Sequence, residues 1–86
     1  MPRVIFDPEP EYTDEARRLK QQGNVVLACV VGADGRVHDA RVQRALGLGL
    51  DEKAIEAVRR WKFEPSRYNG KPVAVKIMVE VNFRMY

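Results

Sequence analysis

The stretch that decides the fold is Val73-Ala74-Val75-Lys76-Ile77-Met78-Val79-Glu80-Val81-Asn82-Phe83. Every odd-numbered residue in it is apolar, most even-numbered residues are polar or charged, and the alternation continues through Arg84 and Met85. Successive side chains of a β-strand point to opposite faces, so a period of two predicts a long strand with one buried face. We expect the other elements to assemble around this strand.

The length and composition describe one small domain. The chain has 86 residues, of which 45% are hydrophobic, and a formal net charge of +3. Its one cysteine cannot form an intramolecular disulfide, its one histidine cannot build a histidine-rich metal site, and no apolar run reaches the roughly 18 residues of a membrane span. Composition therefore excludes a disulfide scaffold, a zinc module and a transmembrane segment within this sequence, and the mild charge does not indicate a nucleic-acid partner.

The N-terminal residues differ in character from the rest. Residues 2–11 hold three prolines among mixed charges, and proline both fixes φ and removes a backbone donor. We therefore expect an extended linker remnant over residues 1–11 and a folded domain over residues 12–86.

A short helix and a strand are expected next. Thr13 or Asp14 can cap the start of the helix, and Gly23 is the natural residue to stop it. The continuous apolar run of residues 24–31 predicts a strand whose two faces are both largely covered.

A hairpin should follow this strand. Gly35 supplies the positive φ of a tight turn, and residues 36–44 form the second strand. In strict alternation, Val37 would face the side of the sheet opposite to Ala40 and Val42. A bulge near Asp39 would bring all three to the same face. A later turn is expected at Asn69-Gly70.

A second helix is predicted between the hairpin and the last strand. Asp51 is expected to cap it, with Leu50 before the cap packing on Ile55. Trp61 falls on its apolar face and should lie against the sheet, and Pro65 should end the helix near Phe63.

The sequence offers few residues for catalysis. Cys29 lies in the most apolar strand, where a thiolate is disfavoured, and His38 and its neighbour Asp39 should point to opposite faces of a strand. Asp34 stands in a turn that lacks the other acidic positions of a calcium loop. We expect no catalytic residue, no metal ligands and no cofactor, and therefore not an enzyme.

Two surfaces remain as candidates for binding a partner. One is a basic cluster beside Tyr68, comprising Arg59, Arg60, Lys62, Arg67 and Lys71; a solvated basic face is favoured over a nucleic-acid site, because Glu56 and Glu64 dilute it. The other is the last strand, because an open three-stranded sheet has two edges that present unpaired N–H and C=O groups. We favour strand addition by a partner over a passive edge covered by the N-terminal arm or a tail. We also expect that the same edge can pair with a second copy as a strand-exchanged homodimer.

The order of motifs resembles the TonB C-terminal domain family over about residues 12–83. The residues that carry the resemblance are Tyr12, Glu15-Ala16-Arg17, Gly23, Asp34-Gly35-Arg36-Val37, Leu50-Asp51, the run Ala57-Val58-Arg59-Arg60-Trp61-Lys62-Phe63-Glu64-Pro65, and Gly70-Lys71-Pro72-Val73. The resemblance implies an α+β fold in which two helices pack on one face of a three-stranded antiparallel sheet. In this interpretation the structural residues are Tyr12, Gly23, Gly35, Leu50, Asp51, Trp61, Phe63 and Pro65.

The resemblance also implies a function. The family suggests the periplasmic domain of an inner-membrane-anchored energy transducer, which receives force from proton-driven motor proteins and passes it to outer-membrane transporters for siderophores and cobalamin. An extended transporter segment would add to the last strand. The partner-binding residues would then be Val75, Lys76, Ile77, Met78, Val79, Glu80, Val81 and Asn82. The alternative is a generic envelope adaptor or a cell-wall-contacting module of a signalling or other periplasmic protein.

Overall fold

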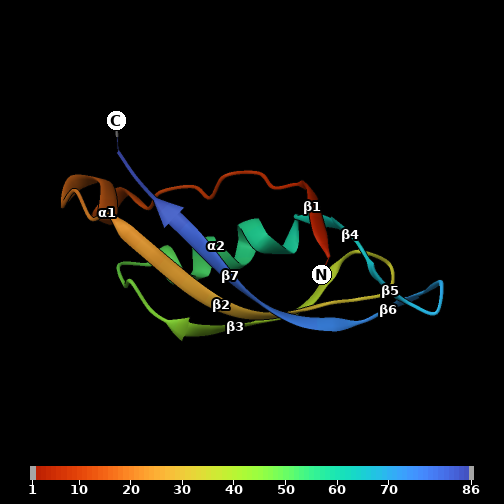
Figure 1. Cartoon of the computed structure of the whole chain (residues 1–86). Coiled ribbons are helices and arrows are strands. Elements are labelled where there is room, and N and C mark those ends of the chain that lie inside the picture. The colour runs from red at the N-terminus through yellow and green to blue at the C-terminus, as the bar shows by residue number, and fades with distance from the viewer. Residues whose placement is uncertain (1, 86) are drawn as a thin grey trace.

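The computed structural model describes residues 2–85, so Met1 and Tyr86, the outer ends of the two expected segments, lie outside the described residues. Figure 1 shows the chain as a thin, elongated α+β domain. In chain order its elements are β1 (Arg3–Phe6), α1 (Asp14–Arg18), β2 (Gly23–Val31), β3 (Val37–Arg44), α2 (Leu50–Arg59), β4 (Lys62–Glu64), β5 (Ser66–Tyr68), β6 (Lys71–Val73) and β7 (Val75–Phe83).

The central sheet has three antiparallel strands in the order β3-β2-β7. β2 and β7 pair without interruption from Gly23 opposite Phe83 to Val31 opposite Val75, as the alternation of the last strand predicts. The β2–β3 register slips at His38, between Val37 and Asp39, which confirms the expected bulge. The sheet therefore exposes β7 as one edge strand and β3 as the other.

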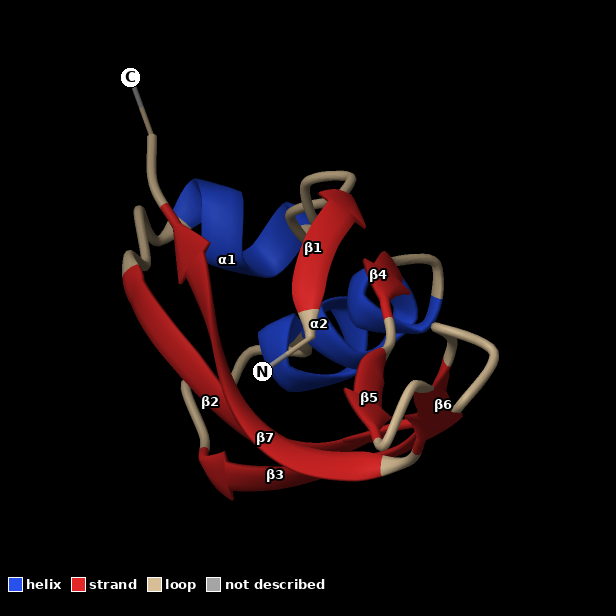
Figure 2. Ribbon diagram, turned by 45° about the vertical axis from the view of Figure 1, so that its right-hand side comes forward, coloured by secondary structure: helices blue, strands red, loops and turns tan. Residues whose placement is uncertain are grey.

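One face of this sheet carries the core. The buried residues of β2 and β7 meet those of α1 and α2 in a single cluster, namely Ala16, Val25, Leu27, Cys29, Leu50, Ala54, Val58, Val79, Val81 and Phe83. Figure 2 shows both helices on the inner side of the curved sheet. The two faces of β2, both predicted to be largely covered, differ in burial: Val26, Ala28 and Val30, which point away from the helices, are half-buried, whereas Val25, Leu27 and Cys29 are buried.

The first helix is shorter than expected. Thr13 caps it as predicted, because its Oγ1 accepts a hydrogen bond from the Ala16 amide at 3.1 Å. The helix ends at Arg18, and the left-handed residue after it is Lys20, with φ of 56°. Gly23 is not the helix stop; it begins β2 with φ of 147°, where an added Cβ would meet the side chain of Leu46.

The second helix also differs from the prediction at both ends. Its N-cap is Gly49, with φ of 77°, and Leu50 is the first helical residue and fully buried. The Asp51 carboxylate instead accepts hydrogen bonds from the loop amides of Leu46, at 2.7 Å, and Gly47, at 3.1 Å. Asp51 therefore fixes the loop that enters the helix.

The second helix stops at Arg59, before Trp61 and well before Pro65. The residues that follow form β4 because they pair with two other parts of the chain. Val4 of β1 lies opposite Phe63, and the Phe63 amide donates to the Gly35 carbonyl at 2.9 Å. Trp61 therefore lies beyond the helix, although its half-buried ring still packs against the core cluster. Local sequence signals do not reveal these partners, which are distant in the chain.

The α+β class is confirmed, but three strands do not account for the whole fold. β1 pairs with β4, and β5 pairs with β6, in two small antiparallel ladders outside the central sheet. The β5–β6 ladder is closed by the predicted turn, with Asn69 at φ of 50° and Gly70 at φ of 77°. The N-terminal arm is extended, and its strand β1 pairs with β4 of the folded domain.

Candidate partner-binding edge

The open edge of β7 presents a defined set of backbone groups. The Gly32 amide donates to the Arg36 carbonyl, so it faces the β3 side of β2. Because amides alternate in direction along a strand, the odd-numbered residues of β2 face β7 and bond their odd-numbered partners there. The N–H and C=O groups of the even-numbered β7 residues therefore point away from β2, toward the open edge; these residues are Lys76, Met78, Glu80 and Asn82.

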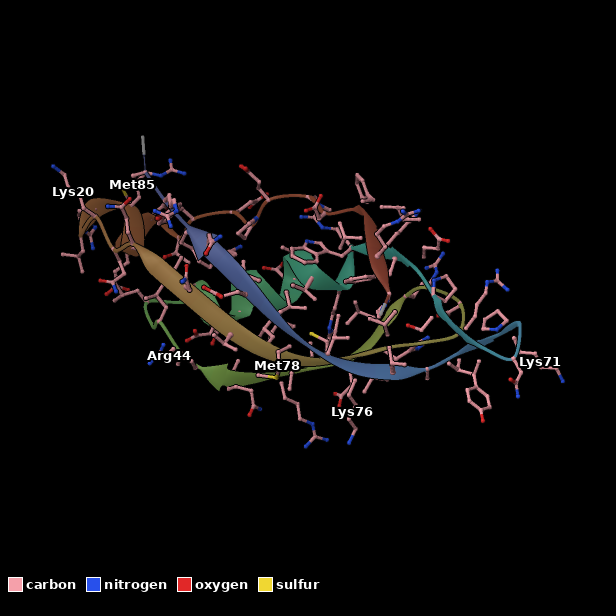
Figure 3. The ribbon with its side chains drawn as sticks, viewed as in Figure 1. Lys20, Arg44, Lys71, Lys76, Met78 and Met85 are labelled. Carbon is pink, nitrogen blue, oxygen red and sulfur yellow. The ribbon has the colours of Figure 1, made fainter. Side chains whose placement is uncertain are left out.

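The side chains of β7 divide in the same alternating way. Val79 and Val81 are buried, Val75 and Ile77 are half-buried, and the even-numbered side chains are exposed on the face away from the helices. Met78 is 62% exposed, and Figure 3 shows it projecting from the sheet next to Lys76. The predicted partner-binding residues thus form one strand in which the even positions expose their side chains and the odd positions pack toward the core.

The arm does not pair with the edge of β7. Its strand β1 pairs with β4, and among the described residues the only ladder partner of β7 is β2. The arm approaches β7 only at its C-terminal end, where Glu9, Pro10 and Tyr12 line an open hollow of about 270 Å³ with Asn82, Phe83 and Arg84. The edge from Val75 to Val81 lacks a ladder partner in the described part of the chain.

Tyr12 anchors the arm where it meets the domain. Its ring meets Phe83 edge-on, with centroids 5.5 Å apart, and its hydroxyl donates to the Gln21 carbonyl at 2.9 Å. Burial raises the pKa of this hydroxyl above its usual value. Tyr12 therefore ties the arm to the end of β7 and to the loop after α1.

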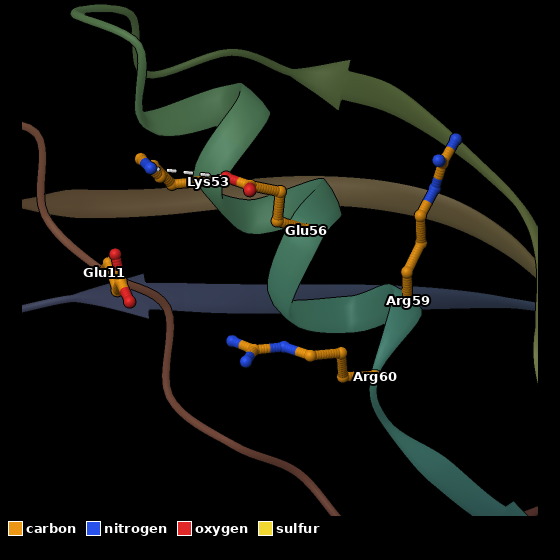
Figure 4. Close-up of a pocket in the computed structure, with 5 residues that line it drawn as sticks. All are labelled: Glu11, Lys53, Glu56, Arg59 and Arg60. Carbon is orange, nitrogen blue, oxygen red and sulfur yellow. Dashed lines mark ion pairs between the residues drawn. The ribbon is translucent and has the colours of Figure 1, made fainter.

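The basic cluster is spread over several elements. Arg59 and Arg60, at the end of α2, line an open pocket of about 310 Å³ with Lys53, Glu56 and Glu11 (Figure 4). The Lys53 ammonium lies 3.4 Å from the Glu56 carboxylate. Lys62 belongs to β4, and Arg67 and Lys71 belong to the β5–β6 ladder, where the Arg67 guanidinium donates to the Gly70 carbonyl at 3.2 Å. Carboxylates stand among the cations of the pocket, so it is not a purely cationic surface.

The candidate reactive groups lie far from a catalytic arrangement. Cys29 is buried in β2, and burial, together with the nearby Asp39 carboxylate, raises the pKa of its thiol to about 11. His38 is exposed and pairs with Asp34 at 2.9 Å. The Asp34 carboxyl, which accepts from the Arg36 amide and from His38, has a lowered pKa. Residues 2–85 contain no group of three potential metal ligands.

The structural residues form the frame behind the edge. Gly35 has φ of 79° in the β2–β3 turn, Phe63 is buried in β4, and Pro65 separates β4 from β5. The indole N–H of Trp61 donates to the Pro8 carbonyl at 3.0 Å. Sequence reasoning missed this contact with the arm; the signal available was the short run Val4-Ile5-Phe6, whose residues favour a strand but lie among prolines.

Comparison with known proteins places this geometry in a family. Residues 8–85 match the family described as Gram-negative bacterial TonB protein C-terminal. Among curated proteins, a Protein TonB from Xanthomonas campestris pv. campestris is 38% identical over 77 residues, covering 88% of this chain and 34% of the relative. Protein tonB2 of Pseudomonas aeruginosa is 33% identical over 82 residues, covering 94% of this chain and 30% of the relative. The chain thus spans about a third of the length of these relatives.

A solved structure agrees with the sequence matches. The solution NMR structure of the Pseudomonas aeruginosa TonB CTD superimposes with a TM-score of 0.78 at 25% sequence identity, covering 98% of this chain and 86% of that one. Within residues 2–85, neither helix has the length and apolar character needed to span a membrane.

Proposed function

Because this chain belongs to the family of TonB protein C-terminal domains, we propose that it is the periplasmic, partner-binding domain of an energy transducer. An extended segment of an outer-membrane transporter adds to β7, and the domain passes on force derived from the proton-motive force at the inner membrane. Siderophores and cobalamin are the proposed cargo class of such transporters. The domain acts by binding and carries out no chemical reaction.

The open edge of β7 carries this proposal. Its four outward-facing residues, Lys76, Met78, Glu80 and Asn82, leave their backbone groups toward solvent along a regular strand, and strand addition draws its affinity from such groups. The buried residues Val79 and Val81 hold the strand rigidly against the core. Because β7 is already ordered, most of the conformational entropy lost on binding is that of the flexible partner segment.

The side chains of this edge are suited to fixing register. Along the outer face of β7, the exposed Met78 lies between two residues of opposite charge, Lys76 and Glu80. The Glu80 carboxylate already accepts a hydrogen bond from the Asn24 amide group at 2.5 Å, which restricts its orientation. A segment that matches this order of charges binds in one register, whereas a shifted segment faces like charges.

The test is a titration of isotope-labelled domain with short N-terminal peptides of outer-membrane transporters. We expect amide shifts along β7 and an affinity on the order of micromolar, or about 8 kcal/mol. Met78→Pro should abolish binding, because proline removes an outward-facing donor, whereas Met78→Ala should weaken it only modestly.

Val42→Pro is the matched control. Val42 lies opposite Leu27, whose amide faces β7, so the amide of Val42 also points away from β2, but at the β3 edge. Peptide binding should survive this change. Shifts confined to residues 59–71, or equal binding by folded Met78→Pro and Met78→Ala, would exclude strand addition at β7.

A further inference from the structure

The N-terminal arm occupies a second strand-binding position, which we call the Trp61 ledge and define as Trp61 and β4. Arg3 and Val4 lie opposite Glu64 and Phe63 in the β1–β4 ladder. The contacts of the ledge therefore suit an extended segment: backbone pairing along β4, a cation beside Glu64, and a carbonyl that reaches the indole N–H of Trp61.

Two polar contacts give this position its chemical preference. The Arg3 guanidinium lies 2.7 Å from the Glu64 carboxylate, and the Pro8 carbonyl accepts from the Trp61 indole at 3.0 Å. The first contact selects a basic residue, whereas the second uses a backbone carbonyl, which any residue offers, and therefore fixes the position of the segment five residues later. The arm satisfies both requirements at once.

The arm is held only weakly in this position. All four residues of β1 are exposed, with Ile5 at 64% and Phe6 at 53%, and the buried core contains no residue from 2–11. The Arg3–Glu64 pair is also open to solvent, where an ion pair contributes little. A segment with few buried contacts opens locally far more readily than the domain unfolds.

The connection between the arm and the domain favours exchange between molecules. Asp7-Pro8-Glu9-Pro10 contains two residues that precede proline and are therefore biased toward extended conformations. Glu11, at the end of this connection, borders the open pocket that Lys53, Glu56, Arg59 and Arg60 also line, and Figure 4 shows the side chain of Arg60 extending toward the arm. A stiff, extended hinge loses little when the arm reaches a neighbour, because the same contacts form there.

We propose that the Trp61 ledge is an exchangeable binding site and that the arm of a second copy, residues 3–8, fills it as concentration rises. Two copies then hold each other's arms in a reciprocal, two-fold dimer. This site lies on β4 and is separate from the β7 edge of the proposed function, so either proposal can fail without the other.

Trp61 is the only tryptophan of the chain, so its fluorescence reports directly on the ledge. The probe is a synthetic peptide of residues 2–10. The peptide is titrated into a chain that lacks residues 2–8, so that its ledge is empty while every residue of the core cluster is kept. We expect a saturable change in Trp61 emission, and a peptide with Arg3→Glu should bind at least roughly two- to five-fold more weakly, because the exposed ion pair is lost and a carboxylate then faces Glu64.

A charge exchange provides the control within the full chain. Arg3→Glu should reduce the dimer fraction measured by sedimentation at high concentration, and adding Glu64→Arg should restore it. Met78→Pro should leave this dimer intact. A Trp61 emission that does not respond to the peptide, a full chain that stays monomeric at millimolar concentration, or a dimer of the Met78→Pro variant that persists without residues 2–8 would each overturn the proposal.

Discussion

At the scale of single residues, Cys29 shows how the core controls chemistry. Its side chain is 1% exposed and lies in the cluster between the sheet and the helices. Burial, with a smaller contribution from Asp39, raises the pKa of the thiol to about 11. Only the thiolate is a good nucleophile, so Cys29 is both inaccessible and in its unreactive form at neutral pH.

Two consequences of this pKa can be measured. In the native state at pH 7 an alkylating reagent should modify Cys29 only as fast as the domain unfolds. The raised pKa favours the folded state below the unfolded value of about 8.5, and this stabilisation is lost as the pH rises toward about 11. Denaturant melts of wild type and Cys29→Ala should show a smaller loss of stability over this range in the variant. Rapid labelling in native buffer would contradict the burial of Cys29.

At the scale of elements, the β2–β3 turn is tied to β4. Gly35 has φ of 79°, its carbonyl accepts from the Phe63 amide at 2.9 Å, and a Cβ on Gly35 would collide with the Phe63 carbonyl. The glycine is therefore needed for two reasons, its left-handed conformation and the close approach of β4. Gly70 shares the first reason, with φ of 77°, but has open space around it.

Alanine substitution at these two glycines should separate the two costs. Gly70→Ala should lower the free energy of unfolding by about 1–2 kcal/mol, the cost of a left-handed conformation. Gly35→Ala should lose about 1–3 kcal/mol more, because the β2–β3 turn and β4 must move apart. Urea denaturation of both variants measures the difference. Equal losses would mean that the contact between the turn and β4 adds nothing to stability.

The elements also show which features could be predicted from sequence. β7 carries its own signal, since alternation over nine residues has one structural interpretation, and the proposed partner-binding edge follows from it. β4 has three residues, and its strand conformation depends on partners in β1 that lie about sixty positions earlier, so no local pattern reveals it. Aspartate favours the N-cap position, so the local sequence predicts a cap at Asp51, but the loop amides of Leu46 and Gly47 donate to its carboxylate instead. Short elements and loop contacts are thus decided by tertiary partners.

At the scale of the whole molecule, the arm and β7 lie in different layers. The domain measures 49 × 21 × 15 Å, and Figure 1 shows the arm running along its length from β4 to α1, with α2 beneath it and the central sheet beyond. Tension applied to the N-terminus therefore reaches the arm first. The arm is attached by the β1–β4 ladder, by Trp61 and by Tyr12, whereas β7 is attached along its whole length to β2.

This arrangement predicts two mechanical steps when the domain is pulled between its N-terminus and a peptide bound on β7. The arm should detach first, at low force and reversibly, because its strand buries little surface. Because the arm is already extended, the extension of this step comes from the arm swinging toward the pulling axis, and it should not exceed about twice the arm's length of roughly 30 Å up to Tyr12, at about 3.3–3.6 Å per residue. The force of this first step should fall in Arg3→Ala, which removes the pair with Glu64, but not in Arg67→Ala, an exposed arginine outside the arm. Optical-tweezer traces measure both steps, and a single rupture without an earlier extension would show that the arm stays attached as firmly as the core strands.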